Sequence, residues 1–144
     1  MCSEYKDYHS DITVGFNLYS RNLSIEELAV ATGIEPNRVW AAGTRRPDSA
    51  LANFISIAYE VRLERATADE ISAAIDELLK RLAPARETLL SVIETLSTEV
   101  GHTPPRLWIS GRPSASENFA QVVTVGAVRE LAALGCEIDI ELYD

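Results

Sequence analysis

The feature that most constrains the fold is a stretch of helix-forming sequence spanning residues 67–100. Its apolar residues recur every three or four positions, a spacing that places side chains on one face of an α-helix. These positions are Ile71, Ile75, Leu78, Leu82, Ala85, Leu89, Ile93, Leu96 and Val100. Because the flanking segments favour strands, turns and short helices, this stretch is expected to be the platform on which a sheet packs.

Pro84 interrupts this helical stretch. A proline inside a helix removes one backbone hydrogen bond and clashes with the preceding turn, at a cost of about 3 kcal/mol. Two arrangements follow: one kinked helix, or two helices with Pro84 at the first position of the second. A straight helix of this length would measure about 50 Å, whereas a domain of this size is roughly 37 Å across. Since the apolar positions stay in phase across Pro84, the sequence favours a single helix kinked there.

Alternating apolar and polar residues predict strands on both sides of the helical stretch. The clearest strands cover residues 11–19, 53–63 and 136–143, and shorter ones cover residues 38–42 and 106–110. Two shorter helices are expected, one from the capping box of Ser24 and Glu27 to Gly33 and one from Thr124 to Gly135. The order predicts an α+β fold, namely a ferredoxin-like sheet of about five strands, mostly antiparallel, covered by a long Pro-kinked central helix and two shorter helices.

A chain of 144 residues has the size of one domain. Residues 1–10 are polar and are expected to form a flexible N-terminus, with a single α+β domain over residues 11–144. The sequence has neither an apolar run of signal-peptide length nor one of about 18 residues that would span a membrane. Cys2 and Cys136 supply no disulfide framework, which favours a cytoplasmic protein with reduced thiols.

The net charge of the chain limits which classes of binding partner are expected. The chain has 22 acidic and 13 basic residues and a formal net charge of −9 at pH 7. This field repels phosphate backbones and anionic lipid, so neither nucleic acid nor a membrane is expected as a partner. The same field would attract a cationic protein. A homodimer through an edge strand or the long helix stays open.

Two hexapeptides, residues 38–43 and 106–111, share the pattern Arg, aliphatic, Trp, any, small, Gly, and an Arg-Pro pair follows each. Chance in short windows and duplication of a unit both explain this pattern. The candidate binding residues are Arg38, Trp40, Arg45, Arg46, Arg106, Trp108 and Arg112. If the two strands lie close together, these side chains form a basic, aromatic patch suited to a carboxylate, a phosphate or an acidic peptide. Otherwise the tryptophans belong to the core and the arginines to solvated loops.

The chain combines an opening strand, a capped helix leading into Gly33-Ile34-Glu35-Pro36, Trp40 and Gly43 before an Arg-Pro pair, a long helix with Leu82 and Pro84, and the ending at residues 131–143. In these features, which cover nearly its whole length, it resembles the bacterial family known as domain of unknown function 4279. Ala42 and Thr44 depart from the more polar residues expected of the family, and residues 53–55 stand where members often carry tryptophan. The resemblance implies a shared fold and no activity, since the family's name carries none.

The strong catalytic signatures are absent from the sequence. It contains no glycine-rich phosphate loop, His-Glu-x-x-His, Gly-x-Ser-x-Gly or Cys-x-x-Cys motif. His9 and His102 have no second ligand in view, so no metal or cofactor is expected. The acidic side chains of Glu137, Asp139 and Glu141 suit either a cation site or a charged edge strand that resists aggregation, and the second interpretation is favoured.

Two classes of function remain. The absence of catalytic motifs, the small size and the acidity favour a non-catalytic protein-interaction or regulatory module, for example an immunity-type antagonist of a cationic bacterial toxin. The alternative is a small-molecule binder or enzyme that uses the arginine and tryptophan patch for an anionic ligand.

Overall fold

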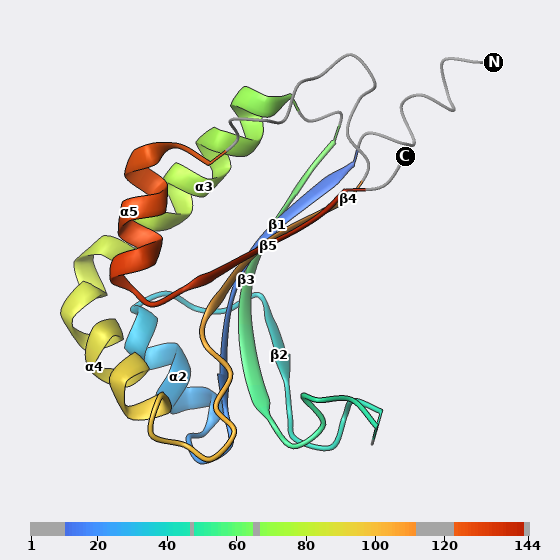
Figure 1. Cartoon of the computed structure of the whole chain (residues 1–144), viewed down its shortest axis with the longest axis vertical. Coiled ribbons are helices and arrows are strands. Elements are labelled where there is room, and N and C mark those ends of the chain that lie inside the picture. The colour runs from blue at the N-terminus through green and yellow to red at the C-terminus, as the bar shows by residue number, and fades with distance from the viewer. Residues whose placement is uncertain (1–10, 47, 65–66, 112–122, 143–144) are drawn as a thin grey trace.

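The computed structural model describes residues 11–46, 48–64, 67–111 and 123–142, and in this part of the chain a five-stranded sheet packs against a layer of helices (Figure 1). The strands are β1 (Ile12–Ser20), β2 (Arg38–Trp40), β3 (Ile55–Leu63), β4 (Arg106–Gly111) and β5 (Glu137–Leu142), in the order β2-β3-β1-β4-β5. Every neighbouring pair is antiparallel except β4 and β5. The α+β fold with a mostly antiparallel sheet is therefore confirmed. Residues 1–10, predicted to be flexible, lie outside the described residues.

The helices cover one face of the sheet and leave the other face bare (Figure 1). They are α2 (Ile25–Thr32), α3 (Ala68–Leu82), α4 (Arg86–Leu96) and α5 (Val125–Ala133). Local signals start three of them, because Ser24 and Thr67 form capping boxes and the Thr124 side chain accepts a hydrogen bond from the first turn of α5. No helix among the described residues is both long enough and apolar enough to cross a lipid bilayer.

The long central helix is a correction to the sequence analysis. A 3₁₀ turn, Ala83–Ala85, separates α3 from α4 and contains Pro84. Two helices therefore replace the single kinked one, because the missing N–H of Pro84 ends the α-helical hydrogen-bond ladder and the tighter turn accommodates its ring. Both helices still bury the predicted apolar face: Ile71, Ile75, Leu78, Leu82, Leu89 and Leu96 are at most 3% exposed. Ile93 is only partly buried.

β1 is the central strand of the sheet and decides what lies on each face. It pairs with β3 on one side and with β4 on the other, and β3 separates β1 from β2 in the split arrangement of a βαββαβ chain order. Its alternate residues Ile12, Val14, Phe16 and Leu18 belong to the hydrophobic core under the helices. Strand residues alternate between faces, so Asn17 and Tyr19 project onto the bare face.

β5 is less buried than the apolar half of its alternation would suggest. Ile138 and Ile140 have the alternation of an inward-facing strand, yet they are 39% and 48% exposed. β5 forms the edge of the sheet and pairs with β4 alone among the described strands. The alternation therefore identifies the face on which these side chains lie but not whether a helix covers them.

A buried carboxylate joins the end of β1 to the segment after α4. Glu99 is 7% exposed. It accepts a hydrogen bond of 2.6 Å from the Ser20 hydroxyl and one of 2.8 Å from the backbone N–H of Arg21. These bonds fix the turn from which α2 begins.

Candidate ligand-binding site

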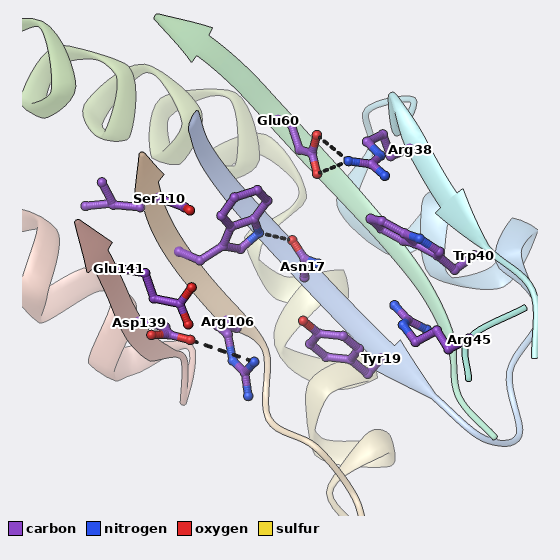
Figure 2. Close-up of a pocket in the computed structure, with 12 residues that line it drawn as sticks. Asn17, Tyr19, Arg38, Trp40, Arg45, Glu60, Arg106, Ser110, Asp139 and Glu141 are labelled. Carbon is purple, nitrogen blue, oxygen red and sulfur yellow. Dashed lines mark hydrogen bonds and ion pairs between the residues drawn. The ribbon is translucent and has the colours of Figure 1, made fainter. Parts of the chain in front are cut away.

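The bare face of the sheet is hollowed by an open cavity of about 320 Å³. Side chains from all five strands line it, together with Arg45 from the loop after β2 (Figure 2). The lining residues are Asn17, Tyr19, Arg38, Trp40, Arg45, Glu60, Arg106, Trp108, Ile109, Ser110, Asp139 and Glu141. We call this cavity the trough.

The strand register explains the shape of the trough. β3 and β1 lie between β2 and β4 and carry small residues on the bare face. Gly15 lies opposite Trp108, Ala58 opposite Arg38, and Ser56 opposite Trp40. Neighbouring strands lie about 4.8 Å apart, which puts the backbones of β2 and β4 about 14 Å apart. β3 and β1 therefore form a low floor, and the large side chains of β2 and β4 form two walls.

Five of the seven candidate residues proposed from the sequence line this one cavity: Arg38, Trp40, Arg45, Arg106 and Trp108. The two similar hexapeptides lie on opposite walls, separated by β3 and β1. Arg46 is not part of the lining; its side chain is 87% exposed and lies 3.5 Å from a carboxylate oxygen of Asp48. Arg112 lies outside the described residues. A binding role for the five stays a prediction.

The wall on β2 is built around Trp40. The guanidinium groups of Arg38 and Arg45 lie 4.6 Å and 5.0 Å from the centre of its indole ring, at cation–π distance. Arg38 also reaches both carboxylate oxygens of Glu60 at 3.3 Å, so its charge is compensated. Trp40 is thus held between two cations at the margin of the trough.

Arg45 differs from Arg38 because no carboxylate lies within ion-pair distance of it among the described residues. Its guanidinium donates a 2.7 Å hydrogen bond to the hydroxyl of Ser56 and a 3.4 Å bond to the backbone carbonyl of Phe54. Burial lowers the pKa of Arg45, an effect that neighbouring Tyr19 opposes. An arginine nevertheless stays protonated at neutral pH. Arg45 therefore brings an uncompensated, partly buried positive charge to the trough.

The wall on β4 depends on a close approach between Trp108 and Gly15. A Cβ atom at Gly15 would lie 2.5 Å from the indole ring, so only glycine lets this side chain lie across β1. The indole N–H donates a 2.6 Å hydrogen bond to the Oδ1 atom of Asn17. Next to it, Arg106 lies 3.7 Å from Glu137 and 4.0 Å from Asp139, which are loose ion pairs.

Tyr19 lies between the two walls, with its hydroxyl directed into the trough (Figure 2). Burial raises the pKa of Tyr19, while the charges of Arg106 and Arg45 and a hydrogen bond with Asn17 lower it. The phenol therefore stays protonated at neutral pH and is available as a donor. Tyr19, Arg45 and Arg106 together can hold a carboxylate or a phosphate group.

No motif predicts Asn17, Tyr19 or Glu60 as site residues, and the sequence favours a protective edge strand for Asp139 and Glu141. The sequence signal that could identify them is the alternation within each strand: every second side chain faces away from the core and therefore lies on the bare face. An aromatic residue such as Tyr19 on an outward-facing position is the strongest part of that signal. Which strands lie next to each other is not encoded in it.

The described residues of the trough include no histidine or cysteine. No group of three or more potential metal ligands occurs in the described parts of the chain. Burial raises the pKa of the Cys136 thiol to about 12, which leaves it a poor nucleophile at neutral pH. The described lining residues thus supply charged, polar and aromatic contacts.

The sequence model of a family described as Domain of unknown function (DUF4279) matches residues 9–103. No curated protein and no solved structure gives a significant match to the chain. The matched region contains β1, β2 and β3, and therefore the floor of the trough and the wall with Trp40 and Arg45. The wall on β4 and the acidic residues of β5 follow it in the chain.

Proposed function

The chain belongs to the DUF4279 family, a domain of unknown function, and we propose that it is a non-catalytic binding module whose trough holds an anionic ligand. The observation that carries this proposal is the position of Arg45. Its charge faces the cavity, and no carboxylate among the described residues compensates it.

The surroundings of Arg45 prepare it for binding. A guanidinium has five N–H donors in a planar fork, and two nitrogens of Arg45 are bonded to Ser56 and Phe54. The remaining donors can form paired hydrogen bonds with a carboxylate or phosphate. Contact with Trp40 and the bond to Ser56 restrict the side chain before the ligand arrives, which lowers the entropy cost of binding.

The aromatic side chains favour a ligand with a flat or apolar body. Trp40, Trp108 and Tyr19 line the cavity and offer ring surfaces beside the cationic groups. A few polar groups among aromatic walls are typical of small-molecule sites. The net charge of −9 opposes polyanions, so a small ligand with one or two negative charges fits better than nucleic acid. A cytoplasmic location stays a prediction. So does a regulatory role with a protein partner, a role that ligand binding would serve.

The test compares two neighbouring arginines. The probes are benzoate, indole-3-acetate, citrate, inorganic phosphate and adenosine monophosphate, screened by thermal shift and then measured by calorimetry. We expect at least one probe to bind, and Arg45→Ala to weaken it by about 10- to 100-fold, the value of charge-assisted hydrogen bonds. Arg46→Ala removes the same charge from the same loop outside the cavity and is expected to change affinity by less than about twofold. Equal effects of the two substitutions, or no binding of any probe, would overturn the proposal.

A further inference from the structure

We infer that the ligand of the trough is bipolar, with an anionic group at Arg45 and a cationic group at Asp139 and Glu141. This inference rests on the proposed function and names the class of molecule that the site takes: an elongated amino-carboxylic acid with an apolar or aromatic middle. It follows from the distribution of charge along the cavity.

The end of the trough away from Arg45 is acidic. Asp139 and Glu141 are two residues apart on β5, so both project from the bare face, and both line the cavity. Figure 2 shows their carboxylates across the cavity from Arg45, with Tyr19 between. Glu141 has no hydrogen bond or ion pair with any described residue, and Asp139 reaches Arg106 only at 4.0 Å.

The lining carries three arginines and three acids, but their pairing leaves a charge at each end. Arg38 is compensated by Glu60, and Arg106 lies near Asp139. The charges that remain are positive at Arg45 and negative at Glu141. A purely anionic ligand would leave Glu141 without a partner, whereas a bipolar ligand meets both ends.

The sheet geometry sets the length of such a ligand. Arg45 is bonded to Ser56 on β3, and Glu141 lies on β5, three strand spacings or about 14 Å away across the sheet. The register puts Glu141 level with Arg62, six residues or about 20 Å from Ser56 along the strands, so the two backbones are about 24 Å apart. Because the side chains reach inward from both ends, the two charges of the ligand are expected to lie roughly 15 Å apart. Its middle would then pass Tyr19 and Trp108, which line the trough between the two charged ends.

Matched pairs of probes test this inference by calorimetry. The amino acids 4-aminobutanoate, 8-aminooctanoate and 11-aminoundecanoate are compared with butanoate, octanoate and undecanoate. We expect 11-aminoundecanoate to bind about three- to fivefold more tightly than undecanoate, as one partly exposed ion pair allows. The shortest amino acid should gain nothing from its amine, since it cannot reach both ends.

Two substitutions locate the effect. Glu141→Gln is expected to abolish the advantage of 11-aminoundecanoate over undecanoate, measured as the ratio of their affinities for the same variant. Glu94→Gln removes an equal charge from α4, on the other side of the sheet, and should leave the advantage intact.

The outcomes separate this inference from the proposed function. If undecanoate binds through Arg45 but the amine of 11-aminoundecanoate adds nothing, or its gain survives Glu141→Gln, the bipolar ligand is overturned and the anion site stands. The same holds if neither series binds while another anion from the first screen does. If no anion binds at all, both proposals fall.

Discussion

The absence of a side chain at Gly15 allows the Trp108 indole to lie across β1. The backbone of Gly15 is not in the left-handed region, so the cost of Gly15→Ala comes from the clash with Trp108. We expect this substitution to lower the free energy of unfolding by about 1 to 3 kcal/mol, as overpacking does. It should also shift the tryptophan fluorescence, because the Trp108 bond to Asn17 is lost. Urea denaturation followed by fluorescence measures both.

Gly126→Ala is the control for Gly15→Ala. A Cβ atom at Gly126 meets nothing closer than 3.9 Å, and alanine is the better helix former in α5. This change should stabilise the fold by up to about 1 kcal/mol. If Gly15→Ala is as harmless as Gly126→Ala, the position of Trp108 over β1 is wrong.

Glu99 is the buried carboxylate on which the end of β1 depends. Glu99→Ala leaves the donors of Ser20 and Arg21 without their acceptor, and we expect a loss of about 2 to 4 kcal/mol in unfolding free energy. Glu94→Ala, on the exposed side of α4, should change it by no more than about 0.5 kcal/mol. Similar effects of the two substitutions in urea denaturation would contradict the structural role of Glu99.

At the scale of elements, the break between α3 and α4 shows how a proline can be accommodated without strain. Pro84 lies in the first turn of a 3₁₀ helix, where a missing N–H costs little. We therefore expect Pro84→Ala to change the unfolding free energy by less than about 1 kcal/mol. A stabilisation near 3 kcal/mol would instead show a proline strained inside a continuous helix.

The elements with local signals could be predicted from the sequence, and their neighbours in space could not. The capping boxes at Ser24 and Thr67 and the left-handed glycines Gly33 and Gly135 mark helix ends within a few residues of chain. The covering of β5 depends instead on where helices pack, so the alternation of its residues does not predict that Ile138 is exposed.

The candidate site was predictable as a set of residue types and not as a shape. Arg38 and Trp108 carry a visible repeat, but their position on facing walls depends on the strand order, which places β3 and β1 between them. The contact of Trp108 with Asn17 joins residues 91 positions apart. No pattern in a short window encodes such a pairing, and the role of Gly15 follows only from it.

For the whole molecule, the one-sided helical layer separates stability from binding. The helices and the inner face of the sheet form the hydrophobic core, so the bare face is available for charged and aromatic side chains. Arg45→Ala is expected to affect binding more than folding, since it removes no contact of the hydrophobic core.

The most direct test of the anion-binding trough uses the indole N–H signals of the protein in solution. The chain has two tryptophans, Trp40 and Trp108, and both line the trough, one on each wall. On titration with the tightest-binding anion of the screen, both indole signals should shift in the nuclear magnetic resonance spectrum, in wild type and in Arg46→Ala. At the anion concentration that half-saturates the wild type, both shifts should fall in Arg45→Ala to about a fifth or less of their wild-type size. Binding that leaves the two indole signals unmoved, or that keeps its wild-type affinity in Arg45→Ala, would contradict an anion-binding trough.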